Sequence, residues 1–307
     1  MNSIKIFSPA TLSNIGPGYD IFGMALQAIG DTIELSWRED KHIEIAPIAG
    51  FPDIPLEANK NIAGLVASLM LKEQGIDKGL NIHISKNVMP GSGLGSSGSS
   101  AAGTAFGLNE LMGKPYSQLE VIDFAMQGEA FLAGKAHADN VAPAVMGGFT
   151  LVTGYQPLHI LKLPPLKNLH IAVVHPQVEV KTVEARKLLP HDISLETHTQ
   201  QGGQIAGLVA GMATGNLHWI KECMRDLIAE PARKKLIPAY EQAKELALVK
   251  GAIGCSISGS GPSIFAFADS EEVANSITEG WQQLYEQQQI DCKCYTSGMN
   301  DKGCEVL

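Results

Sequence analysis

Positive charge is scarce in this 307-residue chain, which holds only four arginines and carries a formal net charge of −9 at pH 7. General nucleic-acid binders and proteins that coat anionic membranes need a basic face, so the composition argues against both classes. No apolar run approaches the roughly 18 residues of a membrane span, and the first residues, MNSIKIFSPATLSN, lack the apolar core of a signal peptide. We therefore expect a soluble, cytoplasmic protein with no nucleic-acid or membrane partner.

Cysteine is sparse as well, with five in the chain. Cys292, Cys294 and Cys304 would make at most a partial metal site, because no second closely spaced cysteine pair or histidine pair accompanies them. Free thiols in a reducing compartment are the better interpretation. The remaining composition, 45% hydrophobic and 18% charged, is typical of a globular protein that forms one large domain or two.

The pattern of apolar residues predicts a mixture of strands and helices. Strands are expected at residues 4–7, 32–37, 43–45, 80–88, 169–175 and 264–268, and helices at 61–74, 99–112, 117–133, 202–212, 219–228 and 234–248. Gly75 suits a helix C-terminus, and Ser117 with Glu120 forms a capping box. Because no regular βαβ repeat is visible, the fold class is α+β. The proline-bearing segment 154–168 marks a boundary, so we expect domains at 1–160 and 161–307.

The most informative segment is the glycine- and serine-rich stretch 88–103, VMPGSGLGSSGSSAAG, between an expected strand and an expected helix. Such a loop directs unpaired backbone N–H groups and the positive end of the helix dipole at one small volume, which favours a phosphate. Residues 93–98 fit GxGxxG, but the region about 20 residues later is helical rather than a strand ending in an acidic residue. Residues 107–114 fail as a Walker loop, because Pro115 follows the lysine.

Two further loops have a similar character: SPATLSNIGPGYD at 8–20, a polar turn between apolar segments, and SISGSGPSIFAF at 256–267. A plain turn without a ligand would not explain why both glycine–serine loops border short apolar strands. With PGSGLGSS at 90–97, this ordered trio resembles the GHMP kinase superfamily across nearly the whole chain. Two departures are Leu12, where a small residue is usual, and Gly98-Ser99, where the family commonly has two alanines. Neither change removes a potential ligand.

Within that superfamily the chain is most similar to the homoserine kinases, through residues 137–140 (HADN), 180–182 (VKT) with 185–186 (AR), and 230–233 (EPAR). The resemblance implies ATP-dependent phosphorylation of the side-chain hydroxyl of L-homoserine, on the route to threonine. It also implies a GHMP kinase fold, with an N-terminal domain like ribosomal protein S5 domain 2 and a C-terminal ferredoxin-like domain, and a homodimer. The alternatives are a mevalonate- or shikimate-type kinase and a non-catalytic binding protein of this fold.

The resemblance also implies which residues bind ATP and Mg²⁺. Backbone groups of two motifs would hold the nucleotide: Pro90, Gly91, Ser92, Gly93, Leu94, Gly95, Ser96, Ser97, Gly259, Ser260 and Gly261. Because Mg²⁺ prefers oxygen ligands, Ser97 and Glu129 are the expected metal ligands. For Glu129 the alternative is an ordinary exposed helix residue.

The resemblance also implies that the acceptor lies beside Asn140. An amide cannot take a proton from a hydroxyl at neutral pH, but it can orient that hydroxyl, and positioning carries much of the rate when the transition state is loose. The neighbouring Asp139 stays open as a base. The guanidinium groups of Arg186 and Arg233 suit a substrate carboxylate, and Asp20 suits an ammonium group. Surface salt bridges are the alternative for either arginine. The remaining expected contacts come from Asn14, Thr182 and His137.

Overall fold

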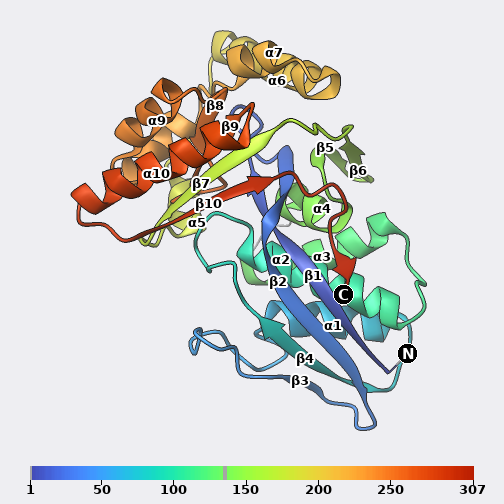
Figure 1. Cartoon of the computed structure of the whole chain (residues 1–307). Helices are drawn as coiled ribbons and strands as arrows, with labels where there is room; N and C mark the ends of the chain where they lie inside the picture. Colours follow the sequence, from blue (N-terminus) through green and yellow to red (C-terminus); the bar gives the residue numbers. More distant parts are fainter. Residues whose placement is uncertain (1, 134–136) are drawn as a thin grey trace.

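The computed structural model describes residues 2–133 and 137–307, apart from the side chains of residues 132, 133 and 182, and over these ranges the chain forms two sheets (Figure 1). The first sheet has the order β11-β1-β2-β4-β3, with β5 beside β2 and β6 beside β5. Its strands are β1 (Ser3–Ser13), β2 (Phe22–Arg38), β3 (Ile43–Ile45), β4 (Gly79–Ser85), β5 (Phe149–Tyr155), β6 (Leu158–Lys162) and β11 (Glu305–Val306).

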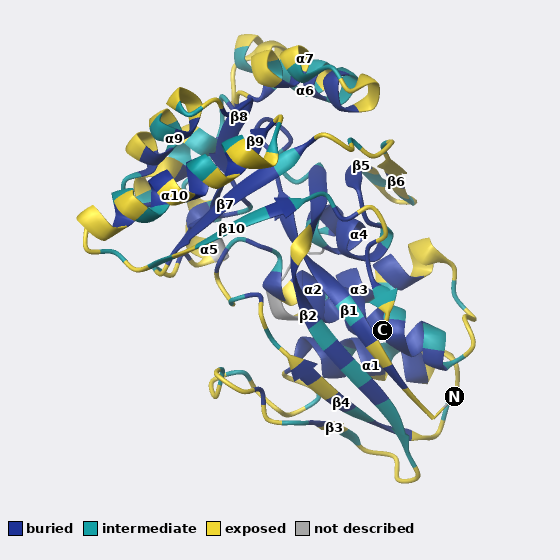
Figure 2. Ribbon diagram, viewed as in Figure 1, coloured by how far each residue is buried: buried dark blue, intermediate teal, exposed yellow. Residues whose placement is uncertain are grey.

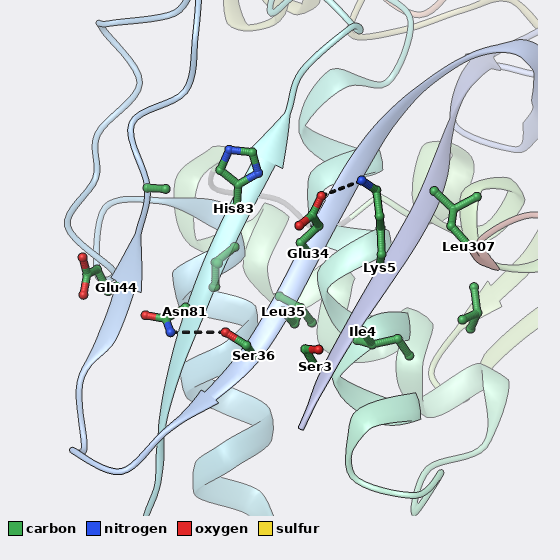
Figure 3. A pocket seen from close by; sticks show the side chains of 13 residues that line it. Ser3, Ile4, Lys5, Glu34, Leu35, Ser36, Glu44, Asn81, His83 and Leu307 are labelled. Atoms are coloured by element: carbon green, nitrogen blue, oxygen red, sulfur yellow. Dashed lines mark hydrogen bonds and ion pairs between the residues drawn. The ribbon is translucent and has the colours of Figure 1, made fainter. Parts of the chain in front are cut away.

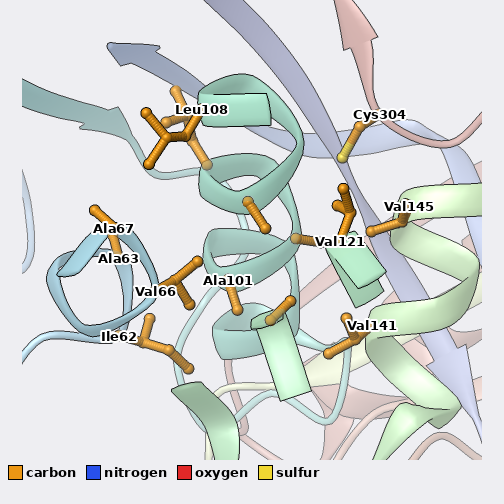
Figure 4. Packing of buried hydrophobic residues seen from close by; sticks show 14 of the residues in the cluster. Ile62, Ala63, Val66, Ala67, Ala101, Leu108, Val121, Val141, Val145 and Cys304 are labelled. Atoms are coloured by element: carbon orange, nitrogen blue, oxygen red, sulfur yellow. The ribbon is translucent and has the colours of Figure 1, made fainter. Parts of the chain in front are cut away.

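Four helices cover one face of this sheet: α1 (Ile62–Glu73), α2 (Ser96–Leu111), α3 (Gln118–Ala133) and α4 (Ala138–Met146). The central helix, α2, packs against the other three and against β1. Figure 4 shows apolar side chains of α1 and α4 on opposite sides of α2. Reciprocal hydrogen bonds join α2 to β1, because the Ser8 hydroxyl donates to the Ser99 carbonyl (2.7 Å) and the Ser99 hydroxyl donates to the Ser8 carbonyl (3.0 Å).

The second sheet is antiparallel, with the order β10-β7-β9-β8. It contains β7 (His170–Pro176), β8 (Gly254–Ile257), β9 (Ile264–Ala268) and β10 (Cys292–Gly298), with α9 (Tyr240–Val249) and α10 (Glu271–Gln287) on one face. Helices precede β8 and α10 precedes β10, which gives the βαββαβ pattern of a ferredoxin-like fold. The α+β class and the ferredoxin-like second part are therefore confirmed.

The two sheets share a hydrophobic core. Alternate residues of β7 and β9 point away from α9 and α10 and pack against residues of β1, β2 and β5 and of the helices α6 (Leu195–Thr214) and α7 (Leu217–Cys223). These strands lie among the buried elements in Figure 2, whereas α6 and α7 expose their outer surfaces. The core residues shared in this way include Leu12, Phe22, Met24, Phe149, Ile171, Val173, Phe265 and Phe267.

Three local expectations are wrong. The helix expected at 219–228 ends at Cys223, because the Asp226 carboxylate accepts the N–H groups of residues 228, 229 and 230 and a new helix, α8 (Ala229–Arg233), begins there. The helix expected at 234–248 is a 3₁₀ turn (Lys234–Leu236) followed by α9, since Pro238 has no N–H to continue the ladder. Residues 8–13 are not a turn but the end of β1.

Other expectations are confirmed. Strand β9 has the predicted bounds, and α1 is capped by Asn61, whose side chain accepts the N–H of Ala63 (3.0 Å). The capping box before α3 is present, with the Ser117 N–H donating to the Glu120 carboxylate (2.8 Å). No helix in the described ranges could span a membrane. The domain boundary at 160/161 stays a prediction: β6 runs across it, and β11 returns from the C-terminus to pair with β1.

Candidate active site

Three loops that are far apart in the sequence meet between the two sheets. The Ser258 hydroxyl donates to the Gly93 carbonyl (2.7 Å), the Ser263 N–H donates to the Ser92 carbonyl (3.1 Å), and the Gly259 N–H donates to the carbonyl of Ser13 (3.0 Å). A Cβ atom on Gly93 would lie 2.5 Å from the Ser258 carbonyl oxygen, so only glycine permits this approach. The three motifs singled out in the sequence therefore build one site.

The central loop delivers backbone donors to this site at the start of α2. Gly95, the N-cap, has φ of +67° and no side chain with which to satisfy the first N–H groups of the helix. The Ser96 hydroxyl is committed to the Val88 carbonyl (2.8 Å), whereas Ser97 is exposed and hydrogen-bonds the Glu129 carboxyl group. Free N–H groups at the positive end of a helix favour an anion, and the phosphate expected here stays a prediction.

A cavity of about 390 Å³ lies in front of this helix end. Most of the predicted nucleotide, metal and acceptor residues line it; Leu94 and Gly261 do not, and the Thr182 side chain lies outside the described residues. Leu94 packs its side chain into the shared core, and only its backbone belongs to the loop. The residues brought together are Asn14, Asp20, Pro90, Gly91, Ser92, Gly93, Gly95, Ser96, Ser97, Glu129, His137, Asn140, Arg186, Arg233, Gly259 and Ser260.

Glu129 reaches the cavity from α3 with one oxygen, Oε1, buried without a hydrogen-bond partner. Burial raises the pKa of this carboxyl group, against the Ser97 hydrogen bond and the nearby charge of Lys86, which lower it. A buried oxygen without a partner is costly unless a ligand satisfies it. The pair of Glu129 and Ser97 therefore fits a hard cation such as Mg²⁺.

Lys86 was not singled out in the sequence, yet it fixes the start of α2. Its ammonium group forms a buried ion pair with Asp31 (2.6 Å) and also donates to the Ser96 carbonyl and the Ser100 hydroxyl (both 3.0 Å). The second Asp31 oxygen accepts the backbone N–H groups of residues 87 and 88. Because both charges are paired and hydrogen-bonded, their burial is tolerable and the loop is held on β2.

A cluster of charged side chains also lines the cavity. Arg186 binds Asp20 through two N–H···O contacts (3.1 and 3.3 Å), and the Nδ1 atom of His137 lies 3.5 Å from the same carboxylate. Arg233 is buried and donates to the Gly259 carbonyl (2.9 Å). Both guanidinium carbons lie over the ring of Tyr19, at 5.6 and 5.1 Å from its centroid. The aromatic ring and Asp20 together allow two cations to sit close to each other.

Asn14 joins this cluster to the glycine loops. Its side-chain amide donates to the Gly259 carbonyl (2.8 Å) and accepts the N–H of Asp20 (3.0 Å). Asn14 and Asp20 both have positive φ angles, 68° and 55°, which asparagine and aspartate tolerate better than most residues. The tight turn between them places Tyr19 and Asp20 under the arginines.

Asn140 and Asp139 follow one another on α4, beside the loop. The Asn140 Oδ1 atom accepts a hydrogen bond from the Thr11 hydroxyl (2.8 Å). Asp139 is buried, and its burial and the charge of Asp20 raise its pKa to about 7, against a Ser13 hydrogen bond and the charge of Arg186. Both residues line the cavity, so the choice between them as the group facing an acceptor hydroxyl stays open.

Comparison with known proteins is consistent with this geometry. Residues 61–148 match the model of the GHMP kinases N terminal domain, and residues 208–287 match that of the GHMP kinases C terminal domain. A homoserine kinase of Chlorobium phaeovibrioides is 40% identical over 296 residues, which cover 93% of this chain and 92% of the relative. The crystal structure of homoserine kinase from Cytophaga hutchinsonii superposes with a TM-score of 0.97 at 40% identity, covering 100% of this chain and 98% of that one.

The chain belongs to the GHMP kinases. More narrowly, its family is that of the homoserine kinases, and it is a kinase enzyme. The mevalonate kinase of Methanococcus jannaschii shares only the fold, with a TM-score of 0.74 at 18% identity over 97% of this chain and 98% of that one. The predicted GHMP kinase fold is thereby confirmed.

One part of the cavity wall in this GHMP kinase was not predicted from the sequence. Beyond the phosphate loop its wall is apolar, formed by Ile48, Ile54, Pro55, Ile62 and Ile84. These residues come from the segment after β3, the start of α1 and the strand β4, and no recognised sequence motif includes them. Only the fold brings them to one side of the cavity, so the tertiary structure was needed to identify this wall.

A second depression of this kinase lies on the outer face of the first sheet (Figure 3). It is lined by side chains that already pair with each other: Lys5 with Glu34 (2.6 Å), and Asn81 with Ser36 (3.2 Å). It contains neither a glycine-rich loop nor a helix N-terminus among the described residues that line it. We assign no ligand to this surface.

Asp139 gives a pH-dependent prediction. Because its pKa is raised to about 7 in the folded protein and lies near 4 in an unfolded chain, the folded state holds the extra proton between those values. Its contribution therefore lowers the free energy of unfolding as pH rises through this window. We expect Asp139→Asn to remove that contribution, so the stability of the variant relative to wild type increases from pH 4 to 7 and then levels.

The measurement is the free energy of unfolding in denaturant at several pH values. Asp53→Asn, which changes an exposed carboxylate, serves as the control and should keep the wild-type profile. The groups facing Asp139 are Asp20, Arg186, Ser13 and Tyr155, all present in both proteins. A constant difference between variant and wild type across the window would show that Asp139 does not hold the proton.

Proposed function

We propose that this chain transfers the γ-phosphoryl group of ATP to the side-chain hydroxyl of L-homoserine and releases O-phospho-L-homoserine, a step toward threonine. The observation that carries the proposal is that the Asp20–Arg186 pair and Asn140 line the same cavity as the glycine loop. The homoserine kinase relatives support the same substrate. A homodimer and a cytoplasmic location are part of this proposal, as the family resemblance implies.

The nucleotide would bind with its phosphates at the start of α2. The open N–H groups after Gly95 and the helix dipole favour the triphosphate there, and a protein with a net charge of −9 needs such a local field. The apolar wall around Ile62 and Ile84 would receive the base. Apolar walls with a few placed polar groups are typical of cofactor sites.

Magnesium would be held by Glu129 and Ser97, the oxygen groups that meet at the mouth of the phosphate loop. When bound, the ion supplies charge neutralisation on the phosphate oxygens. The buried, unpartnered Oε1 atom of Glu129 supports this assignment.

The acceptor would be recognised as a zwitterion. Asp20 already pairs with Arg186 and His137, so an amino acid can insert between opposite charges that the protein holds in place. The substrate carboxylate would bind Arg186 and Arg233, and its ammonium group would bind Asp20. His137 lies beside the Asp20 carboxylate, and Asn14 accepts the Asp20 backbone N–H, so both hold Asp20 in position. Mevalonate and shikimate carry no ammonium group, so Asp20 would be left with a carboxylate beside it.

The acceptor hydroxyl would then lie at Asn140, which orients it while its proton passes to the phosphate, to solvent or to Asp139. Because phosphoryl transfer has a loose transition state, alignment and electrostatic stabilisation can supply most of the rate. Asp139, with its pKa raised to about 7, is placed to take up a proton, but its deeper burial favours Asn140 as the contacting group.

The test is an ADP-release assay with purified protein, ATP and Mg²⁺ across four acceptors: L-homoserine, mevalonate, shikimate and galactose. We expect turnover with homoserine well above the others, and product identification by mass should show O-phosphohomoserine. If only mevalonate or shikimate is phosphorylated, the assignment of homoserine as substrate is wrong. If ATP binds but no acceptor is phosphorylated, the protein is a non-catalytic member of the fold.

Arg186→Met is expected to raise the KM for homoserine about 10- to 100-fold and to leave the KM for ATP near its wild-type value, since one charged hydrogen-bond pair to the carboxylate is lost. The matched control is Arg225→Met, which changes an exposed arginine away from the cavity. A second control uses 3-amino-1-propanol, which lacks the carboxylate. If Arg186→Met weakens use of this analogue equally, Arg186 does not bind the carboxylate.

Glu129→Gln is expected to lower kcat about 100-fold or more, because a neutral amide holds the cation poorly and transition-state charge is stabilised less. Binding of Mn²⁺ in the presence of ADP, followed by electron paramagnetic resonance, should weaken in parallel. Glu120→Gln on the same helix is the control, since Glu120 bonds Ser117 at the surface. Unchanged Mn²⁺ affinity in Glu129→Gln would contradict the ligand assignment.

A further inference from the structure

Thr11 is a fully buried hydroxyl on β1 that no step above uses. The register between β1 and β2 shifts between Pro9 and Thr11, so the strand is irregular at this point. Irregularities of this kind re-aim a side chain and are common beside active sites. Here the strand brings Thr11 between the phosphate loop and α4.

Thr11 forms one hydrogen bond to the phosphate loop and one to α4. Its backbone N–H donates to the carbonyl of Leu94 in the phosphate loop (3.1 Å), and its hydroxyl donates to the Oδ1 atom of Asn140 (2.8 Å). Two residues further along the same strand, the Ser13 hydroxyl hydrogen-bonds Asp139. Because residues two apart lie on the same face of a strand, two hydroxyls of β1 hold two successive residues of α4.

Gly95 packs against both Thr11 and Asn140. A Cβ atom there would lie 2.1 Å from the Thr11 hydroxyl oxygen and 2.8 Å from the Asn140 Oδ1 atom. The N-cap of α2 therefore packs directly on the hydrogen bond between Thr11 and Asn140. Thr11 therefore links the loop proposed to bind phosphate to the Asn140 amide proposed to contact the acceptor.

We propose that Thr11 is a positioning residue for phosphoryl transfer: it sets the orientation of the Asn140 amide and its distance from the phosphate loop. The inference rests on the proposed role of Asn140 at the acceptor hydroxyl. With its Oδ1 atom held by Thr11, the amide keeps one of its two orientations, whereas an amide without that bond can turn over. The acceptor hydroxyl is thereby aligned with the phosphorus that the loop presents.

Alignment of this kind acts on turnover rather than on binding. A misplacement of about 1 Å can cost roughly 100-fold in rate, while the groups that bind the substrate charges and the nucleotide are untouched. A poorly aligned acceptor also competes less well with water for the phosphoryl group. Loss of Thr11 should therefore raise the amount of ADP released per phosphorylated product.

The experiment compares Thr11→Val and Thr11→Ala with Thr11→Ser in the full chain. We expect the first two variants to lower kcat about 100-fold, with KM for homoserine and ATP near wild type and with excess ADP per product. Thr11→Ser keeps the hydroxyl and should restore both kcat and the one-to-one ratio. Thermal unfolding of each variant checks that the fold is retained, and Thr11→Ala avoids added bulk if Thr11→Val folds poorly.

Three results would overturn the proposal: wild-type kcat and product ratio in Thr11→Val or Thr11→Ala, an equal loss in Thr11→Ser, or losses that simply follow reduced stability. In an Asn140→Ala background the same Thr11 substitutions should have little further effect, because Thr11 acts through Asn140. Full additivity would also contradict it. If the wild-type protein prefers another acceptor, the same comparison is made with that acceptor, so the substrate assignment and the role of Thr11 fail separately.

Discussion

The contact between Gly93 and the loop at 258–263 is the constraint on which the site depends. No side chain fits between the Gly93 backbone and the Ser258 carbonyl, and three hydrogen bonds tie the loops to each other and to the end of β1. The loops close the space above the core that the two sheets share. Fixing these backbones also fixes the start of α2, so the direction of its dipole follows from the packing of the two sheets.

The cations around the cavity are each held in place by a specific partner. An acidic protein cannot attract a triphosphate by its overall field, so cations are placed individually and each has a partner. Lys86 is neutralised by Asp31 under the loop, and Arg186 by Asp20 in the wall of the cavity. The only buried carboxyl oxygen in the described part of the chain that lacks a partner belongs to Glu129, where a cation would complete the set. Paired cations keep the cavity formed before ligands arrive, which lowers the ordering cost of binding.

Much of this could be predicted from the sequence because its signals are local. Glycine at 93 and 95, the serines at a helix start and the three ordered motifs carry the phosphate site, and their family resemblance carries the acceptor residues. The helix end at Cys223 and the break between Leu236 and Tyr240 were missed because a capping Asp226 and a single proline outweigh an apolar periodicity. Tyr19 and Thr11 were missed because their contacts span more than 100 residues, as in the hydrogen bond of Thr11 to Asn140. The apolar wall was missed because only the fold brings its residues to the cavity.

The order of Asp139 and Asn140 on α4 shows how the fold divides two tasks. One turn of helix presents an amide beside the phosphate loop and keeps a carboxyl group behind it, held by Ser13 and shielded from water. A carboxylate at the position of Asn140 would place a second negative charge near the phosphates, which repel it. The amide avoids that repulsion and can still orient a hydroxyl by hydrogen bonding, although it cannot take up the proton of that hydroxyl. For a reaction whose transition state needs alignment more than a strong base, this exchange favours rate.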